Sequence, residues 1–97
     1  MKIKFGFLAD DLLNEWDGYD YDATVAAYAA AVDAALKAAY PDAEIEIAYE
    51  SGSGATPAPL KTAVDADGYW DTDHNEIPWV ENIAARVYES FDWLREK

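Results

Sequence analysis

The sequence contains no cysteine, which excludes disulfide bonds, thiolate metal sites and cysteine nucleophiles. It has a single histidine, so one chain cannot supply the two or three imidazole ligands of a typical zinc site. Basic residues are also scarce: seven Lys and Arg face twenty Asp and Glu, for a net charge of −13. This charge argues against direct binding to nucleic acid or to an anionic membrane, because both are negatively charged.

Long apolar runs are absent as well. No stretch approaches the ~20 apolar residues that cross a bilayer. The N-terminus, MKIKFGFLADD, lacks the long apolar segment and cleavage site of a signal peptide. We therefore expect a soluble, cytoplasmic protein whose 97 residues form a single domain, 1–97. Much of its apolar content is alanine, so four Trp, seven Tyr and three Phe must fill a large share of the core.

A long alanine-rich helix is predicted over residues 21–40, YDATVAAYAAAVDAALKAAY. Either Asp20 or Asp22 can accept hydrogen bonds from the free N–H groups of its first turn. Pro41 ends the helix, since the residue before a proline disfavours the helical conformation. The larger side chains recur at helical spacing and predict one buried stripe: Val25, Tyr28, Ala29, Val32 and Leu36.

Strands are predicted on both sides of this helix, over residues 2–9 and 44–50, because apolar and charged residues alternate there. A strand, a helix and a strand in this order form a β-α-β unit with parallel strands. Residues 60–66 predict a third, weaker strand, with Leu60, Thr62 and Val64 on one face. It can pair with the second strand as a hairpin arm or lie elsewhere at an edge of the sheet.

A second helix is predicted over residues 77–90, capped by Asp73 or Asn75, with Pro78 in its first turn. Residues 90–97 favour continuation of the helix, and a short strand is the alternative. The predicted stripe contains Val80, Ile83, Ala84, Val87 and Phe91. The expected fold is α/β (α+β) in the order β-α-β-β-α: a small mixed sheet of three or four strands with two helices on one face.

Two acidic blocks, residues 10–22 and 65–76, are candidates for a calcium site, because oxygen-rich loops suit hard cations. With Gly68 at the glycine position of an EF-hand loop, the first ligand position falls on Ala63 and the twelfth on His74. Neither residue is a suitable ligand, so we expect solvated acidic loops, no metal site and no cofactor, with a weak divalent-cation binder as a minor alternative.

Catalytic patterns are equally lacking. The sequence around Ser51, Ser53 and Ser90 has no nucleophile-elbow motif. A lone histidine beside a helix start, as at His74, is more typical of a surface residue than of a general base. We therefore expect a protein that is not an enzyme.

Aromatic residues are interleaved with the acids of both blocks, and this combination is typical of a binding surface. Tyr and Trp are frequent interface anchors, and a field of carboxylates attracts a basic partner. Burial of these aromatics in the core is the competing interpretation. The predicted partner-binding residues are Asp10, Asp11, Glu15, Trp16, Asp17, Tyr19, Asp20, Asp22, Glu44, Glu46, Glu50, Asp65, Asp67, Tyr69, Trp70, Asp71 and Asp73.

The acidity has two interpretations. One is an inhibitor or adaptor that binds the basic surface of a nucleic-acid-binding protein, as a mimic of DNA with its charge every ~1.7 Å. The other is a small housekeeping domain of a halophilic host. The two blocks are expected at opposite ends of the sheet, with Glu44, Glu46 and Glu50 joining them into an acidic strip. This small, acidic, cysteine-free chain resembles phage-encoded inhibitors such as anti-CRISPR and anti-restriction proteins. The resemblance is one of general type and involves no sequence motif. The sequence leaves the oligomeric state open.

Overall fold

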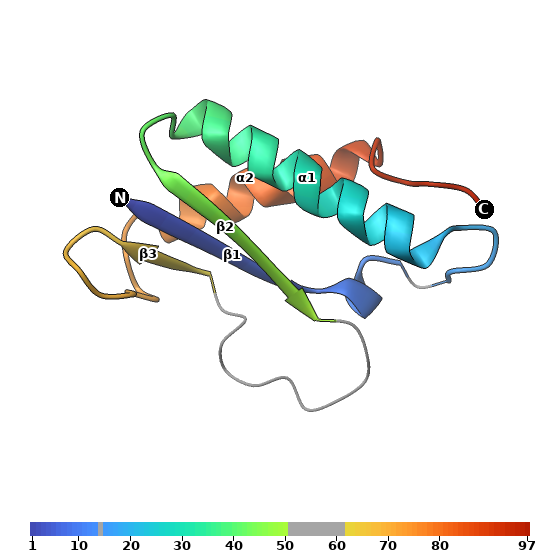
Figure 1. Cartoon of the computed structure of the whole chain (residues 1–97), viewed down its shortest axis with the longest axis horizontal. Coiled ribbons are helices and arrows are strands. Elements are labelled where there is room, and N and C mark those ends of the chain that lie inside the picture. Colours follow the sequence, from blue (N-terminus) through green and yellow to red (C-terminus); the bar gives the residue numbers. More distant parts are fainter. Residues whose placement is uncertain (14, 51–61) are drawn as a thin grey trace.

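The computed structural model describes residues 1–13, 15–50 and 62–97, except for the side chains of Asp11 and Glu50. The predicted order β-α-β-β-α is confirmed. Its elements are β1 (Lys2–Leu8), a short 3₁₀ helix η1 (Ala9–Asp11), α1 (Tyr21–Ala39), β2 (Glu44–Glu50), β3 (Ala63–Asp65) and α2 (Ile77–Ser90) (Figure 1).

The three strands form one mixed sheet in the order β2-β1-β3. β1 runs parallel to β2, with Ile3 opposite Ile45, and antiparallel to β3, with Ile3 opposite Val64. The third strand therefore lies at the far edge of the sheet, and its alternative placement as a hairpin arm on the second strand is wrong. It is also shorter than the predicted range 60–66, of which Leu60 lies outside the described residues.

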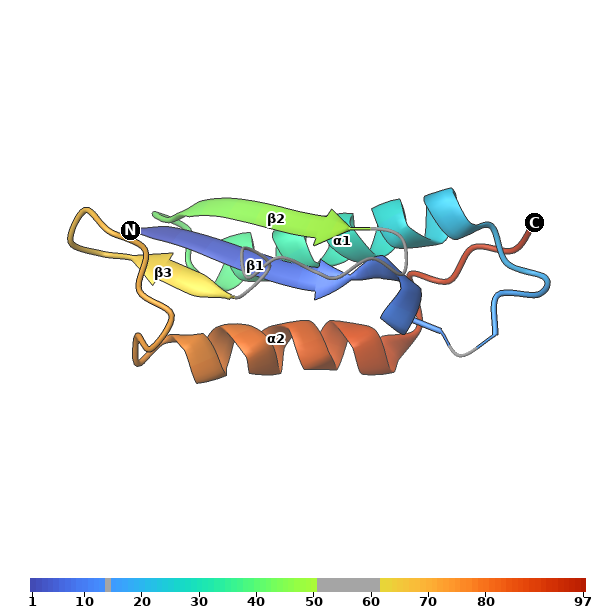
Figure 2. The same ribbon diagram turned by 90° about the horizontal axis from the view of Figure 1, so that it is seen from below.

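Both helices cover the same face of the sheet, as the view from below shows (Figure 2). Ile3 and Phe5 of β1 point toward the helices because alternate side chains of a strand share a face. Each helix presents an apolar stripe to the sheet, and the helix layer and the sheet together enclose one core. Its buried members are Ile3, Phe5, Ala9, Leu12, Val25, Tyr28, Val32, Leu36, Val64, Ile77, Val80, Ala84 and Trp93.

Helix α1 begins and ends close to its predicted bounds. Asp20 is the N-cap, and its Oδ1 accepts a hydrogen bond of 2.9 Å from the N–H of Ala23. The predicted stripe is buried except for Ala29, which is half-buried, and Thr24 is buried beside it. Neither described helix is long and apolar enough to cross a membrane.

The predicted caps of α2 are wrong. The N-cap position is Glu76, which makes no side-chain capping bond. His74 contributes instead: its Nδ1 accepts a hydrogen bond of 3.1 Å from the N–H of Glu76. Asp73 lies one turn earlier, where its N–H donates to Oδ1 of Asp71 over 2.8 Å. Pro78 occupies the first turn as predicted, where its missing N–H costs no helical bond.

The predicted continuation of α2 beyond residue 90 is wrong too. The helix ends at Ser90, and Phe91 adopts a left-handed conformation with φ 56°. The cause is tertiary: Trp93 turns back into the core, where its indole N–H donates to the carbonyls of Val87 and Tyr88 at 3.1 Å each. These carbonyls belong to the last turn, where the regular α-helical N–H partners run out, and they also accept from the hydroxyl of Ser90 and the N–H of Phe91, respectively.

Aromatic side chains supply core volume, as the composition predicted. The ring of Tyr28 lies 5.0 Å from Phe7, 5.3 Å from Trp93 and 6.3 Å from Tyr88, each in edge-to-face geometry. Burial, and secondarily the neighbouring Tyr88, raises the pKa of Tyr28 to about 12. This cluster joins β1, α1 and the segment after α2.

Candidate protein-binding surface

The C-terminal residues lie against the first acidic block. The N–H of Asp20 donates to the carbonyl of Arg95 over 2.8 Å, and the N–H of Lys97 donates to the carbonyl of Gly18 over 3.0 Å. Tyr19 and Glu96 form an antiparallel bridge between these bonds. Segments that are far apart in the sequence therefore share one end of the molecule (Figure 1).

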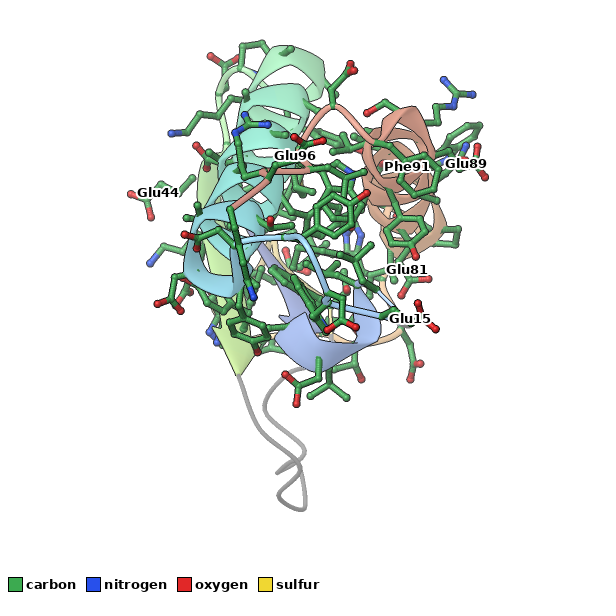
Figure 3. The ribbon with its side chains drawn as sticks, turned by 90° about the vertical axis from the view of Figure 1, so that its right-hand side faces the viewer. Glu15, Glu44, Glu81, Glu89, Phe91 and Glu96 are labelled. Carbon is green, nitrogen blue, oxygen red and sulfur yellow. The ribbon has the colours of Figure 1, made fainter. Side chains whose placement is uncertain are left out.

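This contact gathers carboxylates from three parts of the chain into one surface, which we call the acidic end. It combines the first block with residues from the end of α2 and the tail. In Figure 3, which looks onto this side, Glu96 lies on the tail, and Glu89 lies beside Phe91 at the end of α2. The exposed members are Glu15, Asp17, Asp20, Asp22, Glu89, Asp92 and Glu96.

Few cations oppose these acids. Arg95 and Lys97 lie on the same tail, but the guanidinium of Arg95 donates to the carbonyls of Asp92 and Leu94, at 2.7 and 2.9 Å. Among the described residues, the ion pairs within 4.0 Å involve lysines on β1 and α1, and none involves a carboxylate of the acidic end. The acidic end is therefore a region of largely uncompensated negative charge.

Other members of the first block have structural contacts. Oδ1 of Asp10 accepts a hydrogen bond of 2.5 Å from the hydroxyl of Tyr21. Trp16 is half-buried and packs on the same tyrosine, with ring centroids 4.7 Å apart. Tyr19 is also half-buried. The backbone of Asp11 belongs to η1, and its side chain lies outside the described part. Trp16 and Tyr19 are thus half-buried against the domain, whereas Glu15, Asp17, Asp20 and Asp22 are exposed.

The predicted acidic strip across the sheet is wrong. On the face opposite the helices, Lys2 and Lys4 of β1 lie beside Glu44 and Glu46 of β2, with N–O distances of 3.8 and 3.9 Å. The parallel register therefore places a row of lysines on β1 beside the row of glutamates on β2, so this face carries both charges and is not a continuous acidic strip. The side chain of Glu50 is not described.

The second acidic block lies at the other end of the sheet, as predicted, since β3 runs antiparallel to β1 (Figure 1). Some of its acids shape the loop. Oδ1 of Asp65 accepts a hydrogen bond of 2.7 Å from the N–H of Gly68, whose φ of 96° suits glycine, and Asp71 pairs with Val64. Asp67 and Asp73 are exposed.

The two aromatics of this block differ in role. The side chain of Lys4 lies over the Trp70 ring, 4.8 Å from its centroid, so this tryptophan covers the outer face of the sheet while remaining 41% exposed. Tyr69 is 61% exposed at the loop. The predicted surface is therefore divided between two ends of the molecule rather than brought together.

Across residues 1–13, 15–50 and 62–97, no group of three or more His, Asp or Glu is placed to hold a metal ion. A groove of about 420 Å³ lies between α1 and α2 and ends at Asp92; its lining combines apolar and polar residues: Ala31, Ala35, Ile83, Arg86, Val87, Ser90 and Asp92.

Sequence reasoning missed the contribution of the C-terminal part. Residues 91–97 were predicted to continue the helix or to form a short strand. The position of the tail depends on the pairing of Tyr19 with Glu96, and no local pattern carries information about that contact. Phe91 is 48% exposed and stands among the acids of the acidic end. The signal that could have indicated the turn is Trp93, because tryptophan side chains are highly buried on average.

Comparisons with protein-family models, with curated proteins and with solved structures found no match for this chain.

Proposed function

We propose that this chain is a non-enzymatic interaction protein, an inhibitor or adaptor, whose acidic end binds a basic surface on a nucleic-acid-binding protein. The observation that carries the proposal is the docking of the tail on the first acidic block. It brings Glu96 of the tail beside acids of the first block, and among the described residues none of these acids forms an ion pair. Nothing in core packing requires acids at these exposed positions.

Electrostatics supports a basic partner. Carboxylates spread over one convex end raise the encounter rate with a positively charged surface. Proteins that hold nucleic acid offer such surfaces, because they neutralise phosphates with Lys and Arg. The alternating Lys and Glu rows on the outer face of the sheet favour engagement through the end of the molecule. They argue against a DNA mimic that lies lengthwise along its target.

Phe91 is suited to anchor the contact. Its ring is 48% exposed yet lies 5.7 Å from Tyr88 and 5.9 Å from Trp93, which restrict its motion. A partly immobilised aromatic loses little conformational freedom on binding. Its left-handed backbone is unusual for a bulky residue, and such outliers concentrate at functional positions.

Capture of partners from lysate on the immobilised protein tests the proposal. A basic protein should be retained at ~50 mM salt and released at ~500 mM, because the screening length falls well below 10 Å. Failure to retain any basic protein at low salt would reject the proposal.

The halophilic interpretation makes a different prediction. A domain whose acids serve salt adaptation should unfold in dilute buffer and gain stability as KCl is added. An interaction protein should remain folded at ~10 mM KCl, because its core is apolar and its exposed acids lie mainly at the two ends of the sheet. Melting temperatures across a range of KCl concentrations distinguish the two.

A further inference from the structure

A second binding surface is formed by the outer edge of β2. The order β2-β1-β3 places β2 at an edge, and no described residue pairs with its outer side. Figure 3 likewise shows no described segment beyond β2 on the side away from β1. The N–H of Glu44 donates to the carbonyl of Met1. Because backbone groups alternate in direction along a strand, those of Ile45, Ile47 and Tyr49 point to the open edge.

The side chains along this edge form two distinct rows. On the helix side, Ile45 and Ile47 are only half-buried, and Tyr49 is 44% exposed although its ring stacks on Phe7 at 5.2 Å. On the opposite face, the side chains of Glu44 and Glu46 remain 80% and 59% exposed despite their lysine neighbours. Among the described residues, the edge therefore offers backbone groups without a strand partner, a row of apolar side chains that are only partly buried, and a row of exposed glutamates.

The chain itself shows which residue pattern β2 accepts. On its paired side, β1 places Lys2 and Lys4 beside the acidic row, and Ile3 and Phe5 beside the apolar row. A strand added on the open side meets the same two rows of β2, since opposite residues of paired strands lie on the same face. Alternating basic and apolar residues are therefore the matching chemistry, whichever way the added strand runs.

We propose that the edge of β2 binds an extended segment of a partner protein in which basic and apolar residues alternate. Main-chain hydrogen bonds to a sheet edge supply affinity, and the side-chain rows supply specificity. A second copy of this chain is a poor occupant. Pairing two β2 edges about a two-fold axis brings their acidic rows together, and each chain carries a net charge of −13.

The probe is a seven-residue synthetic peptide in which lysine alternates with isoleucine, phenylalanine and valine, titrated into the full chain. Its control has the same composition, with the lysines grouped at one end. Two further peptides carry N-methyl groups, one on the amides of the lysines and one on those of the apolar residues. In an added strand only one of these sets faces β2: the apolar set if the strand is antiparallel and the lysine set if it is parallel.

We expect one methylated peptide to bind about tenfold or more weakly than the other, because it loses several main-chain hydrogen bonds. Backbone NMR shifts should concentrate at Ile45, Ile47 and Tyr49, and the grouped control should bind weakly. Equal affinity of the two methylated peptides, or of the grouped and alternating peptides, overturns the proposal. So does a dimer of the unliganded chain in sedimentation that pairs through β2.

This inference is independent of the proposed function, because none of its residues belongs to the acidic end. Replacing Glu46 by Gln should weaken peptide binding, whereas replacing the exposed Glu81 of α2 by Gln, with the same change in net charge, should leave it nearly unchanged. Equal effects of the two substitutions overturn the edge site. Shifts confined to the acidic end would also overturn it and leave the proposed function standing.

Discussion

Thr24 and Arg95 exchange two hydrogen bonds. Oγ1 of Thr24 donates to the carbonyl of Arg95 and accepts from its N–H, each over 3.1 Å, although the residues are 71 positions apart. The threonine is fully buried in the first turn of α1. A side chain of the longest helix thus fixes the tail in place, and with it the part of the acidic end that comes from the C-terminus.

Replacing Thr24 by Val should remove both bonds while keeping the shape of the side chain. The N–H of Arg95 then loses its partner, whereas its carbonyl keeps the hydrogen bond from the N–H of Asp20, so we expect the unfolding free energy to fall by about 1 kcal/mol. The tail should also open locally, which amide exchange of Arg95 measures. Thr24→Ser, which keeps the hydroxyl, should retain most of the protection. Unchanged exchange in the valine variant would show that other contacts hold the tail.

The left-handed conformation of Phe91 predicts an inverted order of stability for two substitutions. Alanine and glycine both remove the ring, but only alanine bears the steric cost of φ 56°. Phe91→Gly should therefore be more stable than Phe91→Ala by about 1 kcal/mol in urea unfolding, the reverse of the order inside a helix. Equal stability would mean that the tail relaxes once the ring is gone.

Asp20 and Asp22 belong to the acidic end but should differ in their effect on stability. Asp20 caps α1, so Asp20→Ala should cost about 1 kcal/mol of unfolding free energy. Asp22 is exposed in the first turn and interacts with the helix dipole alone, so Asp22→Ala should cost about 0.3 kcal/mol. Both variants lose one negative charge, so the difference between them measures the cap. Equal costs would contradict this assignment.

The phenol of Tyr28 predicts alkaline destabilisation. Burial raises its pKa to about 12, so the folded state keeps the proton where the unfolded chain, with an ordinary value of 10.0, releases it. The associated stability is complete below pH 10 and is lost as the pH rises to about 12. Tyr28→Phe should flatten this decline. Part of the decline should remain in this variant, because the pKa of Tyr40 is also raised to about 12, by burial and by Glu76. An unchanged slope would contradict the assignment.

Local patterns predicted the parts of the fold that local interactions determine. The charge alternation of β1 and β2, the aspartate before α1 and Pro41 after it each act within a few residues, and these elements were placed correctly. The parallel pairing of β1 and β2 also followed, because a helix of this length connects parallel strands.

The remainder depends on contacts between distant residues. The alternation over residues 2–9 and 44–50 predicts the two strands, but only the register between β1 and β2 reveals that Lys2 and Lys4 lie 3.8 and 3.9 Å from Glu44 and Glu46. Likewise, the stripe spacing continued through Phe91, whereas burial of Trp93 required a turn there. Only part of the acidic end was predicted from the sequence: the acidic block at 10–22 was included, and the C-terminal tail was not.

The most direct test of the acidic end compares two variants of equal charge. One carries Asp17→Asn, Asp92→Asn and Glu96→Gln, and its matched control carries Asp67→Asn, Asp73→Asn and Glu81→Gln. All six side chains are exposed. The measurement is the dissociation constant for the basic protein retained at ~50 mM salt.

We predict that the acidic-end variant binds at least about tenfold more weakly than the control, since interfacial charges act mainly at short range in salt. Equal weakening of both variants would show that net charge alone governs binding. No weakening in either would show that the acidic end is not the binding surface. Both results would contradict the account.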